Sequence, residues 1–156
     1  MLKAPIANEA QIDKVAILRN VALFQSLDEP HLRSLAALCR LGAFPEGDEI
    51  IEQGDELLEE EDGLYIIVAG HVDVRRGATN EADGRHIATL GPGEFFGEMA
   101  LLDGHARSAS VFAMSDVVCM MLSRWDFQRQ LRSDPEIAMR ALAVLSGRIR
   151  NLLETV

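Results

Sequence analysis

The feature that most constrains the fold is a change in hydrophobic periodicity at residue 41. Residues 41–122 form a series of short β-branched or alternating runs, such as LYIIVAGHVDV and SASVFAMSDVVCMMLS. A period of two is typical of strands, and glycine suits the tight turns between them. The spacing predicts about eight antiparallel strands in a sandwich or barrel of the jelly-roll kind, and we expect a jelly-roll barrel. The glycines that separate the runs are Gly47, Gly54, Gly70, Gly84, Gly91 and Gly93.

Helical patterns flank these runs, so the predicted fold class is α+β, mainly β. Within residues 1–40, Asp28 is placed to cap a helix that carries Pro30 in its first turn. Residues 123–156 predict two more helices, one capped by Ser123 and one by Asp134. The last helix should run for about 20 residues and cover either the strands or a partner. Its expected apolar stripe is Ile137, Ala141, Leu145, Ile149 and Leu152.

Length and composition predict one compact domain over residues 1–156. The chain is 48% hydrophobic and 26% charged, which is typical of a globular protein. It has no apolar run long enough to cross a bilayer and no signal sequence, so we expect it in the cytoplasm. A net charge of −10 argues against nucleic acid or a membrane surface as a partner.

The remaining reactive side chains predict little chemistry. Cys39 and Cys119 lie in apolar runs without metal-ligand spacing, so we expect buried, reduced thiols. The four histidines form no ligand pattern, and no metal is expected. Residues 55–63, DELLEEEDG, carry six acids and predict a solvated loop between strands. A cation site and a docking patch for a partner stay open as alternatives for that loop.

One segment combines charges with small residues. In GPGEFFGEMALLDGHARSAS, residues 91–110, a short helix and an Asp-Gly turn bring Glu98 and Arg107 toward one cavity. Arginine beside free helix N–H groups suits one phosphate, and a carboxylate accepts hydrogen bonds from a ribose. A mononucleotide fits this chemistry. An internal ion pair between Glu98 and Arg107 is the alternative.

The same residues resemble the phosphate-binding cassette of the cyclic nucleotide-binding domain family. The matching run is Phe96, Gly97, Glu98, Met99, Ala100, Leu101 and Leu102, followed by Arg107, Ser108, Ala109, Ser110 and Val111. LFQSL, FPEGDEIIEQGD and LYIIVAGHVDV are further family-like marks. The resemblance implies a domain of helices in residues 1–40, a barrel in 41–122 with the cassette at 93–111, and C-terminal lid helices in 123–156.

The resemblance also implies roles for individual residues. Arg107 would hold the cyclic phosphate and Glu98 the ribose 2′-hydroxyl. The implied ligand-binding set is Gly97, Glu98, Met99, Ala100, Arg107, Ser108 and Ala109. Contacts that cap the base would come from Arg148, Leu152 and Leu153. The expected ligand is cAMP, with cGMP as the alternative because Ser108 places a hydroxyl directly after the arginine.

The implied function is sensing without catalysis. Ligand binding would move the cassette and the lid helices and so regulate a partner protein or an effector domain. No cofactor is expected. The initiator methionine and the N-terminal helix favour a stand-alone sensor. The alternatives are a ligand-free interaction module of the same fold and a sensor of another effector, such as a cyclic dinucleotide.

Overall fold

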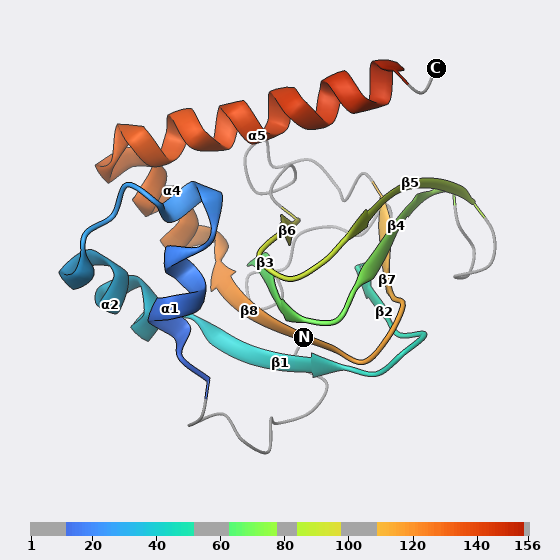
Figure 1. Cartoon of the computed structure of the whole chain (residues 1–156), viewed down its shortest axis with the longest axis horizontal. Helices are drawn as coiled ribbons and strands as arrows, with labels where there is room; N and C mark the ends of the chain where they lie inside the picture. The colour runs from blue at the N-terminus through green and yellow to red at the C-terminus, as the bar shows by residue number, and fades with distance from the viewer. Residues whose placement is uncertain (1–11, 52–62, 78–83, 98–108, 155–156) are drawn as a thin grey trace.

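A computed structural model describes residues 12–51, 63–77, 84–97 and 109–154. Three helical segments precede the strands (Figure 1). They are α1 (Lys14–Arg19), the 3-10 turn η2 (Ala22–Phe24) and α2 (Glu29–Leu38). The predicted cap of α2 is confirmed, because the Asp28 side chain accepts a hydrogen bond from the backbone N–H of His31. This hydrogen bond lowers the pKa of Asp28.

The described residues that follow form eight strands, as the glycine spacing predicts, in two four-stranded antiparallel sheets. The first sheet has the order β1-β8-β3-β6 and the second the order β2-β7-β4-β5. Neither sheet closes on itself or on the other in the described part of the chain, so the predicted jelly-roll barrel is not confirmed. The strands are β1 (Arg40–Phe44), β2 (Glu49–Ile51), β3 (Gly63–Ala69), β4 (Val72–Arg76), β5 (Arg85–Leu90), β6 (Phe95–Phe96), β7 (Ser110–Ala113) and β8 (Val117–Ser123).

The first sheet is buried on both faces. Leu64 and Ile66 of β3 pack into a cluster with the helices, whereas Tyr65 and Ile67 pack into a cluster with the second sheet. Side chains alternate across a strand, so a strand between two apolar layers must be apolar at every position. This requirement explains why β3 reads as an almost continuous apolar run. The molecule therefore has three layers, with the helices, the first sheet and the second sheet in that order.

Two helices follow β8, namely α4 (Arg124–Ser133) and α5 (Pro135–Glu154). Their predicted caps are confirmed, because Ser123 accepts from the N–H of Asp126 and Asp134 accepts from the N–H of Glu136. The 20 residues of α5 lie along one edge of the molecule (Figure 1).

The predicted stripe of α5 is only partly correct. Ile137 and Ala141 are buried against the helical cluster, and Val144 packs on its margin. Ile149 is instead 57% exposed. Residues four apart differ by 40° in their direction around a helix. A stripe of residues spaced four apart therefore moves gradually away from the buried face. The exposed large apolar side chains of α5 are Met139, Leu142, Ile149 and Leu153.

Both cysteines are free and buried, as predicted. Burial raises the pKa of Cys39 and the pKa of Cys119 to about 12, so both groups are protonated thiols at neutral pH. Thiols react as thiolates, and these two also lack access to reagent.

We therefore predict that neither cysteine reacts with a disulfide reagent at pH 8 until the protein unfolds. Labelling followed by mass spectrometry should show no modified native protein, and full modification of both thiols in denaturant. Rapid labelling of either cysteine under native conditions would show that the packing around it is wrong.

Candidate functional site

The predicted site lies mostly outside the described residues. Glu98, Met99, Ala100, Arg107 and Ser108 fall within the range 98–108, so the structure does not test their placement. Of the cassette at 93–111, it describes residues 93–97 and 109–111, which include Gly97 and Ala109.

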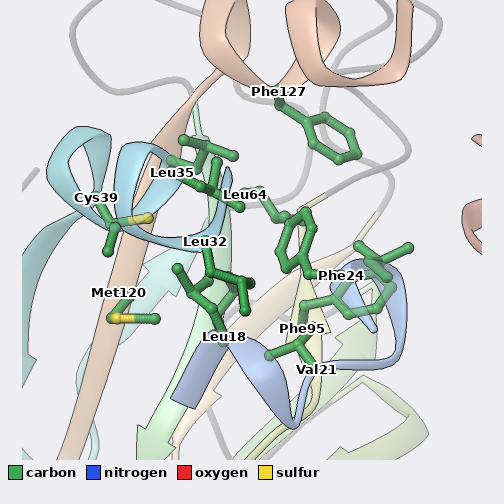
Figure 2. Packing of buried hydrophobic residues seen from close by; sticks show 14 of the residues in the cluster. Leu18, Val21, Phe24, Leu32, Leu35, Cys39, Leu64, Phe95, Met120 and Phe127 are labelled. Atoms are coloured by element: carbon green, nitrogen blue, oxygen red, sulfur yellow. The ribbon is translucent and has the colours of Figure 1, made fainter. Parts of the chain in front are cut away.

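The first end of the cassette is held by two consecutive aromatic residues. Phe95 and Phe96 form β6, which pairs with Tyr65 and Ile66 of β3 at the edge of the first sheet. Phe96 stacks on Tyr65, with ring centroids 5.0 Å apart and planes within 5°. Phe95 points to the opposite face and lies in the helical cluster with Phe24 and Val21 (Figure 2). A strand of only two residues is thus fixed between two apolar layers.

Gly97 follows this strand with φ 91°. A left-handed φ suits glycine, because a Cβ would approach the following carbonyl group. The chain therefore leaves β6 in a direction that few other residues allow, directly before Glu98.

The other end of the cassette enters the second sheet. Ala109 is half-buried and precedes β7, whose first residue, Ser110, is 1% exposed. β7 pairs with β2 on one side and with β4 on the other. The cassette thus connects the edge of the first sheet to an inner strand of the second.

Arg148 of α5 contacts the strand that begins the cassette. Its guanidinium lies 4.7 Å from the centre of the Phe95 ring, and its Nη2 donates a hydrogen bond to the Phe95 carbonyl oxygen. Both contacts join residues 53 positions apart in the sequence. Arg148, a predicted base-capping residue, therefore contacts Phe95 in this structure, two residues before Gly97.

The other two predicted capping positions have no described contact of this kind. Leu153 is 69% exposed, and the side chain of Leu152 lies outside the described part of the structure. The contact between Arg148 and Phe95 was missed by sequence reasoning. The sequence feature that pointed toward it was the pair Phe95 and Phe96, because two consecutive aromatic residues indicate a strand covered on both faces.

The described residues contain no group of three or more His, Cys, Asp and Glu side chains that could hold a metal ion. Within the same ranges, no helix has the length and apolar character needed to span a bilayer.

Comparison with known proteins assigns the family. The model of the cyclic nucleotide-binding domain matches residues 41–134, which is more than half of the chain. The chain belongs to this family. Domains of the family are typically regulatory rather than catalytic, and the match covers both ends of the cassette.

Individual relatives agree with this assignment. The chain is 38% identical to the cyclic AMP receptor protein of Thermus thermophilus over 69% of its own length and 47% of the relative. It is 29% identical to a CRP-like cAMP-activated global transcriptional regulator of Mycobacterium tuberculosis, over 86% of its own length and 58% of the relative. The chain thus spans about half the length of these curated relatives. Because one of them is a transcriptional regulator, the expectation that nucleic acid is not a partner has no support here.

A solved structure shows the same fold. The crystal structure of a cyclic nucleotide-binding domain from Methylobacillus flagellatus superposes with a TM-score of 0.74 at 28% identity. It covers 92% of this chain and 80% of that one. The arrangement of helices and antiparallel sheets is therefore that of the family.

We predict that Gly97→Ala lowers the free energy of unfolding by about 1–2 kcal/mol, the cost of a left-handed residue with a Cβ. Urea denaturation measures this change. Gly147→Ala is the matched control, because Gly147 lies within α5 and a Cβ added there would meet nothing within 4 Å. The control should raise stability by up to about 1 kcal/mol. Equal effects of the two substitutions would contradict the described backbone at Gly97.

We also predict that Arg148→Met loosens the C-terminal half of α5. Methionine keeps apolar contact but removes the hydrogen bond and the cation, a loss of about 1 kcal/mol or roughly a fivefold change in local opening. Hydrogen exchange read by mass spectrometry should be faster for residues after 145. The exposed Arg150→Met serves as control and should leave exchange unchanged. Unchanged exchange in Arg148→Met would show that the contact with Phe95 does not hold the helix.

Proposed function

We propose that this chain binds a cyclic mononucleotide at the cassette and responds by repositioning α5, thereby regulating a partner protein or an effector domain. The family match over residues 41–134 carries the proposal, because the matched sequence keeps both charged groups that a cyclic nucleotide needs, Glu98 and Arg107. cAMP is the first choice of ligand, since the two relatives described above are named for it. cGMP is the alternative because of the Ser108 hydroxyl.

Each charged residue has a separate chemical task in this proposal. Arg107 binds the exocyclic oxygens of the cyclic phosphate, which carries a single negative charge that one guanidinium matches. Glu98 accepts a hydrogen bond from the ribose 2′-hydroxyl. Backbone groups around Gly97, Ala100 and Ser108 complete the binding surface, and Met99 and Ala109 lie beside them in the sequence. No bond is made or broken, so the output is a change in population between conformations.

The contact between Arg148 and Phe95 supports a route from ligand to helix. A ligand that shifts the cassette pulls on Gly97 and therefore on β6, where the carbonyl oxygen of Phe95 holds Arg148. If Arg148 is to contact the base, it must first leave Phe95. Either movement changes how the C-terminal half of α5 is held. The size of the shift in population depends on how much more tightly the ligand binds one arrangement of Arg148, on Phe95 or released from it, than the other.

The outward face of α5 supports a protein as the partner. Met139, Leu142 and Ile149 are each more than half exposed on the described chain, although they are large and apolar. Their spacing of three and seven residues places them on one side of the helix. A surface of this kind is buried by another protein surface more readily than by a polyanion.

We predict that cAMP binds the wild-type protein with a Kd of tens of micromolar or tighter, and that Arg107→Lys weakens binding by about 2 kcal/mol or more, roughly 30-fold. Lysine keeps the charge and loses the planar pair of donors. Isothermal titration calorimetry with cAMP, cGMP and a cyclic dinucleotide provides the measurement.

Arg129→Lys on α4 is the matched control for the loss of a guanidinium elsewhere and should not change the affinity. Binding that survives Arg107→Lys unchanged would place the ligand at another site. Absence of binding by both cAMP and cGMP at these concentrations would exclude the proposed function and favour the ligand-free interaction module. Binding of the cyclic dinucleotide alone would favour a sensor of that other effector.

A further inference from the structure

A basic and aromatic surface lies on the outward side of α4. The helix is held from its other side, where Phe127 is fully buried in the helical cluster. Trp125 is instead 58% exposed, although it is a large aromatic side chain, and Arg129, Arg132 and Ser133 are exposed as well. These four residues line a shallow hollow of about 320 Å³, and we call them the α4 surface.

Helix geometry brings these side chains together. Trp125, Arg129 and Arg132 are separated by four and three residues, which places them on one face of the helix. The rise along the axis from Trp125 to Arg132 is only about 10 Å. An extended peptide covers that distance with about three residues. A short segment of another protein can therefore contact the indole ring and both guanidinium groups at once.

The charge of the α4 surface is opposite to that of the chain, whose net charge is −10. Arg129 and Arg132 supply two positive charges. The Asp126 carboxylate lies 3.9 Å from Arg129 and also accepts a hydrogen bond from the Ser123 hydroxyl, so it offsets part of one of them. Arg132 is exposed and has no ion pair within the described ranges. The surface thus retains positive charge that an external carboxylate can bind.

We propose that the α4 surface is the docking surface for a short acidic segment of a separate protein. A carboxylate of that segment binds Arg129 and Arg132, and a leucine or aromatic side chain lies in the hollow against Trp125. Charge complementarity carries this proposal, which is independent of the proposed nucleotide function. Arginine binds carboxylates through paired N–H donors. Tryptophan and arginine are also enriched among the residues that dominate the binding energy of protein interfaces.

The charge of the rest of the chain favours a short acidic segment over an extended polyanion. Interactions between exposed charges more than about 8 Å apart are largely screened at physiological salt, so the two arginines act mainly on groups close to them. A nucleic acid or an anionic membrane would also approach the neighbouring surface of a chain with a net charge of −10, which repels it. A peptide of a few residues can contact the α4 surface alone.

Trp125 is the only tryptophan in the chain, so its fluorescence reports directly on the hollow. The probe is the blocked peptide Ac-Glu-Glu-Leu-Phe-Glu-Glu-NH2, which contains no tryptophan, titrated into the full chain at low salt. We expect a saturating change in Trp125 emission with a Kd below about 1 mM, and about tenfold weaker binding to the double variant Arg129→Gln, Arg132→Gln. Raising NaCl to about 0.5 M should weaken binding to the wild type by a similar factor.

Two matched controls test the site and the apolar contact separately. The double variant Arg76→Gln, Arg150→Gln removes two exposed arginines on β4 and α5 and should bind the peptide as the wild type does. The peptide Ac-Glu-Glu-Gly-Gly-Glu-Glu-NH2 keeps the charge but lacks the apolar side chains. It should bind the wild type about tenfold more weakly, because the indole ring then has no apolar partner.

Unchanged Trp125 emission at several millimolar peptide would overturn the proposal. Equal affinity of the peptide for the wild type and for Arg129→Gln, Arg132→Gln would also overturn it, because the peptide would then bind elsewhere. The same titration with phosphatidylserine vesicles and with oligothymidylate tests the two other classes of anionic partner. Tighter binding of either than of the peptide would contradict the proposal in favour of a membrane or a nucleic acid.

Discussion

The burial of the first sheet between two apolar layers is the constraint on which the rest of the structure depends. Its strands must supply one set of side chains to the helices and the alternate set to the second sheet. β6 meets this requirement with only two residues, Phe95 and Phe96, which face opposite layers. A change of register by one residue would exchange their faces and break both the stack on Tyr65 and the packing on Phe24. The beginning of the cassette is therefore fixed by packing on both faces, together with the backbone pairing of β6 with β3.

This fixed point also gives α5 its connection to the cassette. Most of the buried contacts of α5 come from its first half, where Ile137 and Ala141 join the helical cluster. Farther along, Arg148 holds the helix to Phe95 through a carbonyl hydrogen bond and the face of the ring. The first half of α5 is thus firmly packed, and its second half is held by the contacts of Arg148. This arrangement suits a helix that changes position when the cassette does. In the proposed function, the cyclic nucleotide acts on that second half.

Local rules predicted much of this fold from the sequence. The caps at Asp28, Ser123 and Asp134 were correct because each side chain bonds a backbone N–H two or three residues away. The number of strands followed from glycine spacing. Closure into a barrel did not follow, because it depends on how separate sheets meet. The contact of Arg148 with Phe95 also arises only in the folded chain, whereas the exposure of Ile149 follows from the 40° advance of residues four apart on α5. In the candidate site, local chemistry and family resemblance both point to Glu98 and Arg107. Their roles stay predictions, because the two residues lie outside the described part of the chain.

The central claim is that ligand at the cassette repositions α5, and a distance measured across the molecule tests it most directly. Spin labels at exposed Ala37→Cys on α2 and Asn151→Cys on α5 give such a distance, and the two native cysteines are buried. We expect saturating cAMP to shift the mean distance from pulsed electron paramagnetic resonance by several ångströms, and the same protein with Arg107→Lys to show no shift at that concentration. Superimposable distance distributions for the protein with and without bound cAMP would contradict the claim.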